Sequence, residues 1–131
     1  MTDGKRAGVL LRIDGALAFL PVSSVLRIAE MPAITHVPGA PAAMLGIANA
    51  GGDVVPVISL AHGGGPPRGA LVLCTWLGEP FGLAGAEVVQ TGSFEVDGSA
   101  RDCVRVESAR VPTLDLASLH AKLRTTAWAG R

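Results

Sequence analysis

The sequence predicts an all-β protein of two small related lobes, with helix confined to a short segment after residue 40 and to the C-terminus. Glycine and proline supply 17 and 9 of the 131 residues, and this many helix-breaking residues argues against long helices. Short apolar segments alternate with turn pairs, as strands joined by hairpins do. Residues 56–61 are also similar to residues 112–117, about half a chain length later, and this favours two related lobes over one sandwich.

Composition narrows the class of protein. Hydrophobic residues make up 49% of the chain and charged residues 17%, so the chain can fill a core. The 11 basic residues balance the 11 acidic ones, and no stripe of arginines argues for nucleic-acid binding. Apolar runs such as residues 70–77 stop well short of the roughly 20 residues of a bilayer crossing. Arg12 and Asp14 interrupt the first apolar stretch too early for a signal peptide. We expect a cytoplasmic protein without membrane insertion.

The chain opens with a predicted hairpin. Two apolar segments within residues 9–20 flank Asp14-Gly15, a pair that tolerates the positive φ of a tight primed turn. Within residues 22–30, Ser23-Ser24 predicts a corner turn that leads into a third strand. Across residues 38–46, a proline in the first turn and a glycine at the end predict one or two turns of helix.

A second hairpin is predicted within residues 47–60. Its turn is Gly51-Gly52-Asp53, where glycines can adopt left-handed conformations. Pro56 marks an edge, a bulge or a barrel corner in the second arm, because proline cannot donate to a ladder. Residues 62–68 contain three glycines and two prolines and are the predicted boundary between the halves.

The second half repeats this rhythm of short strands and ends in a helix. Asp115 can cap a closing helix over residues 116–124, whose Leu116, Leu119 and Leu123 share one face. The predicted strands of this half are residues 70–77, 81–84, 87–91, 94–96, 102–107 and 111–114.

The side chains that usually carry chemistry form no recognisable constellation. The chain has no nucleophile elbow, P-loop, dinucleotide fingerprint or zinc-protease motif. The three histidines, His36, His62 and His120, have no common strand or helix spacing, and Cys74 and Cys103 have no neighbouring ligand. The sequence therefore predicts no catalytic residue, no metal site and no cofactor, and a protein that is not an enzyme.

Some features leave alternatives open. Residues 62–65 imitate the oxyanion-hole string of some esterases, so a small hydrolase that uses the loop at His62 is one alternative. A generic barrel-like peptide-binding module is another. Cys74 and Trp76, within an apolar strand, are predicted to be core residues, whereas Trp128 near the C-terminus is open as an interface anchor.

The middle of the chain resembles the CheW-like domain. Residues 37–41 form a proline-bracketed turn, and residues 45–60 (LGIANAGGDVVPVISL) are similar to the family's G-[VI]-x-N-L-R-G hairpin followed by a [PV]-rich strand. The resemblance extends over most of residues 7–123 and implies two packed five-stranded SH3-like barrel lobes. Lobe 1 would span about residues 16–61 and lobe 2 about residues 69–112, and exchange of the first strands and the C-terminal segment between lobes stays open.

The resemblance also implies a function. Family members are non-enzymatic adapters of bacterial chemosensory signalling: the cytoplasmic tip of a chemoreceptor, a methyl-accepting chemotaxis protein, docks in the groove between the lobes. The lobes also pair with the regulatory domain of a histidine kinase or with another CheW-like protein. On motif position, the receptor-binding groove would contain Val25, Arg27, Gly46, Asn49, Gly51 and Gly52.

Two positions depart from the family pattern. Arg27 stands at the acidic position of V-x-E-I, and Gly51 stands at the arginine of N-L-R-G. The change is either drift in an exposed pair, worth about 0 to 1 kcal/mol, or altered partner choice, since reversed charge rejects wrong partners. Residues 92–110 are also shorter than the resemblance implies, which leaves open an accessory form with weak or no kinase binding.

Overall fold

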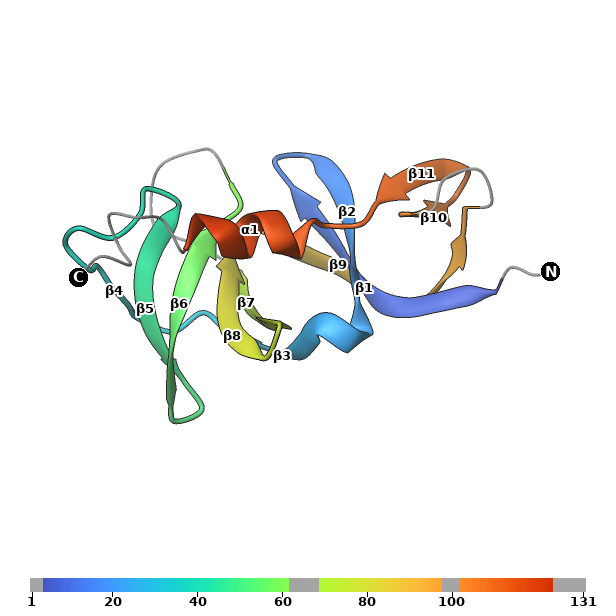
Figure 1. Ribbon diagram of the computed structural model, residues 1–131. Helices are drawn as coiled ribbons and strands as arrows, with labels where there is room; N and C mark the ends of the chain where they lie inside the picture. The colour runs from blue at the N-terminus through green and yellow to red at the C-terminus, as the bar shows by residue number, and fades with distance from the viewer. Residues whose placement is uncertain (1–3, 62–68, 98–101, 124–131) are drawn as a thin grey trace.

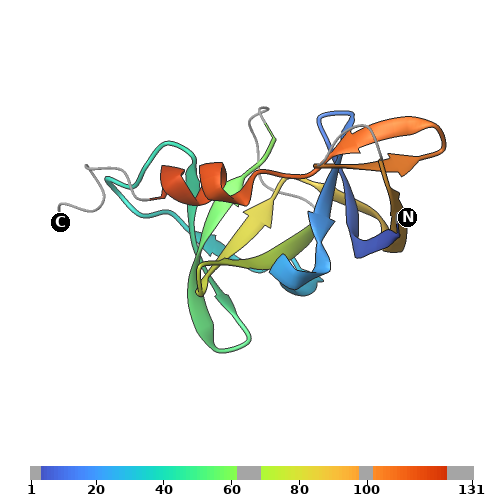
Figure 2. The ribbon, with the colours of Figure 1, turned by 45° about the vertical axis from the view of Figure 1, so that its right-hand side comes forward.

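Short β-segments joined by tight turns form two curled sheets that lie side by side in the computed structural model (Figure 1). The structure describes residues 4–61, 69–97 and 102–123. The predicted boundary at residues 62–68, the loop at His62 and Trp128 lie outside this described part. The all-β prediction is confirmed, and one helix, α1 (Leu116–Lys122), lies along one of the sheets (Figures 1 and 2).

One sheet joins the first two strands of the chain to its last three strands, and we refer to it as the terminal barrel. Its strand order is β11 (Ala109–Pro112), β10 (Cys103–Val106), β9 (Glu87–Val96), β1 (Lys5–Ile13) and β2 (Ala16–Pro21). The sheet curls on itself because Phe19 of β2 forms an isolated parallel bridge with Thr113, just after β11. The amide of Leu114 also donates to the carbonyl of Phe19 at 2.8 Å. Phe19 is fully buried in this barrel's core.

The other sheet holds the middle of the chain, and we refer to it as the central barrel. Its strand order is β3 (Val25–Glu30), β7 (Ala70–Trp76), β8 (Glu79–Ala84), β6 (Asp53–Ser59), β5 (Met44–Ala50) and β4 (Ile34–Thr35). The strands at its two ends, β3 and β4, are consecutive in the chain, so the sheet has to curl to bring them together. A 3-10 turn, η1 (Val22–Ser24), connects the two barrels.

The sheets divide the chain differently from the expected lobe limits. The strands of residues 70–84 belong with β3 to β6, because β8 pairs in parallel with β6 and β7 pairs with β3. The first two strands belong with the last three, because β1 pairs along most of its length with β9. The five-stranded expectation holds for the terminal barrel, whereas the short β4 makes the central sheet six-stranded. The similarity between residues 56–61 and 112–117 is not structural, since the first lies in β6 and the second leads into α1.

Both predicted hairpin turns are confirmed. Asp14 and Gly15 have φ values of 49° and 86°, and Gly51 and Gly52 have φ values of 65° and 99°, as a primed turn requires. Pro56 lies where β6 is still unpaired on one side, because the pairing with β8 begins only at Val57.

The helix expected across residues 38–46 is absent, so this prediction is wrong. Two successive turns replace it: the amide of Ala40 donates to the carbonyl of Val37 at 3.2 Å, and that of Met44 donates to Pro41 at 3.0 Å. Pro41 disfavours helical geometry in Ala40, since its ring clashes with the backbone of the residue before it. The C-terminal helix is confirmed, and the Asp115 carboxylate accepts from the amide of Ser118 at 3.1 Å.

The two barrels share one apolar core. Val9, Leu11 and Leu20 of the terminal barrel pack in the same cluster as Val72 and Phe81 of the central barrel. Leu116 of α1 and Leu123, which caps the end of the helix, complete this cluster and attach the helix to the shared core. The lobes therefore form one cooperative unit rather than two independent domains.

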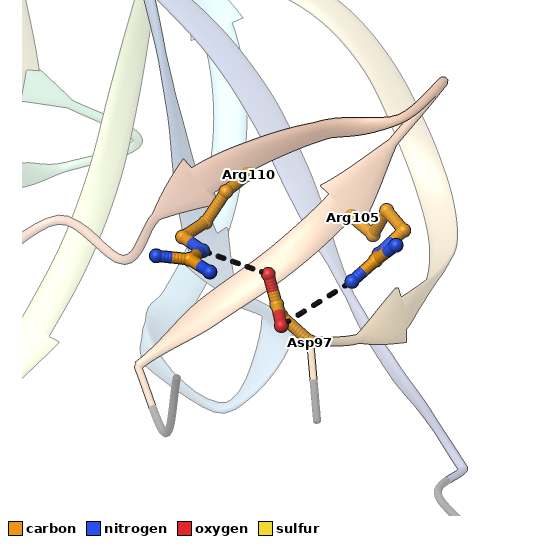
Figure 3. A network of polar contacts seen from close by, with 3 residues as sticks. All are labelled: Asp97, Arg105 and Arg110. Carbon is orange, nitrogen blue, oxygen red and sulfur yellow. Dashed lines mark hydrogen bonds and ion pairs between the residues drawn. The ribbon is translucent and has the colours of Figure 1, made fainter. Parts of the chain in front are cut away.

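A buried carboxylate holds the far hairpin of the terminal barrel (Figure 3). Asp97, 3% exposed, accepts from Nε of Arg110 at 2.9 Å and from Nη2 of Arg105 at 3.4 Å. β10 pairs with β9 at only two positions, Val104 and Arg105. The ion pairs thus strengthen a weakly paired junction.

Candidate functional site

The strongest candidate surface lies where β3 approaches the tip of the β5–β6 hairpin. The Arg27 side chain extends from β3 to this tip, and a Cβ added at Gly51 would lie 2.7 Å from Nη2 of Arg27. Gly51 therefore leaves room for the guanidinium. The structure thus brings together the two residues at which the chain departs from the CheW-like pattern, although they are far apart in sequence.

The hairpin tip is ordered by a local hydrogen bond. The side-chain oxygen Oδ1 of Asn49 accepts from the amide of Gly52 at 3.0 Å. This bond and the positive φ values of both glycines fix the turn without any side chain on it. Asn49, Gly51 and Gly52 are all exposed, so the tip offers backbone and the guanidinium of Arg27 to a partner.

The two other predicted groove residues have different surroundings. Gly46 is buried, with a φ of 154°, and a Cβ there would collide with the carbonyl oxygen of Thr35 in β4. Its role is to let β4 approach β5. Val25 is half-buried against the shared core, opposite Cys74 of β7. Four of the six predicted residues thus meet at one tip, and these two support the strands that carry it.

Two exposed apolar residues are neighbours of these residues in sequence. Leu26 of β3 is 56% exposed, and Val54, which follows the hairpin turn, is 63% exposed. Since β3 is at the end of its sheet, one side of its backbone is also unpaired by β-strands of the described residues. We refer to Leu26, Arg27, Asn49, the Gly51-Gly52 turn and Val54 as the hairpin-tip surface.

A cleft lies at the junction of the two barrels, apart from the hairpin-tip surface. It has a volume of about 460 Å³ and is lined by Pro21, Ser24, Trp76, Asp102, Thr113, Leu114, Asp115, Leu116 and Ala117. None of the six predicted groove residues lines it, although Val25 directly follows Ser24. The prediction that Trp76 is a core residue is therefore only partly correct, because Trp76 is half-buried and forms a wall of this cleft.

Sequence reasoning missed this cleft and the exposed Leu77, which follows the lining residue Trp76 in sequence. Leu77, next to Trp76, is 84% exposed and has a φ of 52° in the β7–β8 turn. The sequence did contain a signal for the exposure of Leu77. Leu77-Gly78 is the pair in a tight hairpin turn, where Asn-Gly or Asp-Gly is usual and where the first side chain faces solvent. The cleft residues themselves come from distant segments and carry no such local signal.

Two titratable side chains, those of Cys74 and His120, are packed within the fold. Burial raises the pKa of the Cys74 thiol from 9.0 to about 12, so Cys74 stays protonated at neutral pH and is a poor nucleophile. His120 of α1 lies 2.6 Å from Oε1 of Glu79 and next to the ring of Phe81, which ties the helix to the central barrel. Within residues 4–61, 69–97 and 102–123 no cluster of three or more potential ligands could hold a metal ion. No helix of this described part is long and apolar enough to cross a membrane.

Two β-barrels with a shared core and an exposed strand-and-hairpin surface define a β-barrel protein without an evident catalytic centre in its described part. Comparison with known families identifies the family of this protein. The model of the CheW-like domain matches residues 7–88, and the chain belongs to this family. The fold is similar to that of the scaffolding protein TtCheW from Thermoanaerobacter tengcongensis, with a TM-score of 0.70 and 18% sequence identity. The similarity covers 87% of this chain and 90% of that one. A search of curated proteins found no match.

Proposed function

We propose that this protein is a non-enzymatic adapter of a bacterial chemosensory complex that binds the cytoplasmic tip of a chemoreceptor. The observation that carries the proposal is the hairpin-tip surface, where four of the six residues expected at a receptor groove meet on a member of the CheW-like family. The scaffolding role named for TtCheW, a protein of similar fold, supports it.

The chemistry of the hairpin-tip surface suits a helical partner. Leu26 and Val54 offer apolar contacts, and the Gly51-Gly52 turn leaves space for close approach of a backbone. A helix that docks on such a surface uses apolar anchors along one face. Gly46 is buried and Val25 is half-buried against the shared core, so these two would support β5 and β3, and the proposed contact with the partner involves the other four residues.

Coupling to a histidine kinase is the second part of the proposal. The adapter would join the receptor to the kinase's regulatory domain or to another CheW-like protein. The short segment over residues 92–110 also admits an accessory form, which binds the receptor with weak or no binding to the kinase.

Capture by the tagged full-length protein tests both parts. The tagged protein is the bait, and it is offered the purified cytoplasmic fragment of a chemoreceptor and the regulatory domain of a chemosensory histidine kinase from the same organism. Capture of both supports a coupling adapter, and capture of the receptor alone supports the accessory form. Capture of neither refutes the proposal. A Val54→Ser variant should capture less receptor fragment, whereas Val89→Ser is its matched control, because Val89 is a partly exposed valine of β9, on the other barrel.

A further inference from the structure

We propose that Arg27 selects an acidic partner: the docking segment presents a carboxylate to the guanidinium that lies over the β5–β6 tip. This inference rests on the proposed function, because it names the chemistry of the receptor segment that the hairpin-tip surface binds. Three observations support it: where the Arg27 side chain lies, the absence of an ion-pair partner for it among the described residues, and the residues around it.

The guanidinium lies against the hairpin tip. From the position of a Cβ added at Gly51, the three nearest heavy atoms are Nη2, Nη1 and Cζ of Arg27, at 2.7, 3.1 and 3.2 Å. The contact therefore involves the planar head of the side chain and not its flexible stem. Glycine at position 51 is what admits the head, and any side chain there would displace it. The guanidinium is planar, and its N–H groups can form two parallel hydrogen bonds with a carboxylate.

Arg27 differs from the other arginines that the structure describes. Arg12 pairs with Glu87 at 3.2 Å, and Arg105 and Arg110 pair with Asp97. Arg6 lies over the ring of Phe19, with Cζ 5.2 Å from its centroid. Within residues 4–61, 69–97 and 102–123, no hydrogen bond or ion pair engages the Arg27 guanidinium.

This lack of a partner is not due to a lack of carboxylates nearby in the chain. Glu30 lies on the same strand and Asp53 begins β6 directly after the hairpin turn, yet neither pairs with Arg27. The cation thus remains available to a docked molecule. Charge complementarity then assigns a carboxylate to the partner at this point.

The surroundings favour a protein carboxylate over a phosphate chain. Leu26, which precedes Arg27 on β3, and Val54, which follows the hairpin turn, are both exposed, so a docked apolar segment that covered them would exclude water and strengthen the ion pair. A nucleic acid or a phosphate-rich surface needs several cations in a row. Here Glu30 and Asp53 are the nearest charged residues along the two strands, and both are acidic.

Titration calorimetry of the full-length protein with the receptor's cytoplasmic fragment tests the inference. Arg27→Met, which keeps an unbranched apolar stem and removes the charge, is expected to weaken binding about tenfold. Arg27→Glu is expected to weaken it further. Arg12→Met is the matched control and should leave the affinity unchanged, because Arg12 pairs with Glu87 on the other barrel.

Two further measurements separate partner selection from a structural role. Affinity of the natural protein should fall as salt rises from 50 to about 300 mM, whereas that of the Arg27→Met variant should depend less on salt. Arg27→Lys, which keeps the positive charge, should bind more tightly than Arg27→Met. A merely structural role of Arg27 predicts neither result.

The outcomes distinguish a failure of the role of Arg27 from a failure of receptor binding itself. If the natural protein binds the receptor fragment and all Arg27 variants bind equally well, the inference is overturned and the proposed function stands. If the natural protein does not bind the fragment, the proposed function fails and the inference fails with it. Weakening by Arg27→Met that is accompanied by an unchanged salt dependence contradicts an ion pair as the cause.

Discussion

Leu77 offers the clearest test of the backbone reasoning, because it combines two unfavourable features. Its φ of 52° lies in the left-handed region, which costs a residue with a bulky Cβ substituent about 1 to 2 kcal/mol. Its side chain is 84% exposed, so truncation or replacement forfeits only about 0.3 kcal/mol of burial. Leu77→Asn supplies the residue that a primed turn prefers at this position. We expect the free energy of unfolding to rise by about 1 kcal/mol.

Urea denaturation followed by far-UV circular dichroism measures this gain. With a slope of about 1 to 2 kcal/mol per molar urea, the midpoint should rise by about 0.5 to 1 M. Leu77→Ala is the matched control: it removes the exposed side chain and keeps the backbone cost, so its midpoint should not rise. A Leu77→Asn protein no more stable than the Leu77→Ala protein would refute the reasoning from backbone strain.

Three other changes test the fold. Asp97→Asn removes the charge that Arg105 and its neighbouring arginine share, and should lower the free energy of unfolding by about 2 kcal/mol, measured by urea denaturation. Gly46→Ala directs a Cβ at the carbonyl of Thr35 and should cost about 2 kcal/mol and increase hydrogen exchange in β4. Because burial raises the pKa of Cys74 from 9.0 to about 12, the unfolded thiol ionises first as pH rises. The stability that this thiol contributes is therefore full below pH 9 and falls by about 1.4 kcal/mol per pH unit toward pH 12.

Each of these expectations has a result that contradicts it. An Asp97→Asn protein as stable as the natural one would mean that the ion pairs contribute nothing to the terminal barrel. Unchanged exchange in β4 of the Gly46→Ala protein would contradict the close approach of β4 and β5. For Cys74, a Cys74→Ala variant should lose the alkaline slope; an identical slope in both proteins would show that another group is responsible.

Local signals in the sequence were sufficient for the turns and for the last helix. Asp14-Gly15 and Gly51-Gly52 predict primed turns because glycine readily adopts a positive φ and aspartate tolerates one, whatever the rest of the chain does. Asp115 predicts the start of α1 for the same reason, since a cap acts within one turn. The short helix expected after residue 40 failed because the effect of Pro41 on the residue before it outweighed the proline and glycine at the segment's ends.

The membership of strands in sheets could not be predicted from local signals. β1 pairs with β9, which lies near the other end of the chain, and no pattern within either strand specifies the partner. The same limit applies to the candidate site. Arg27 and Gly51 come together only through the curl of the central barrel, so their proximity became an expectation only through the family resemblance. The cleft beside Trp76 combines four separate segments and had no equivalent in the sequence reasoning.

Nuclear magnetic resonance of the isotopically labelled protein, titrated with the unlabelled receptor fragment, addresses the central claim most directly. The account predicts that the largest shifts of backbone amides fall on β3 around Arg27 and on Asn49, Gly51 and Gly52, with the amides of β10 and β11 unchanged. Saturable shifts confined to another face, or an unchanged spectrum at fragment concentrations well above those of the protein, would contradict it.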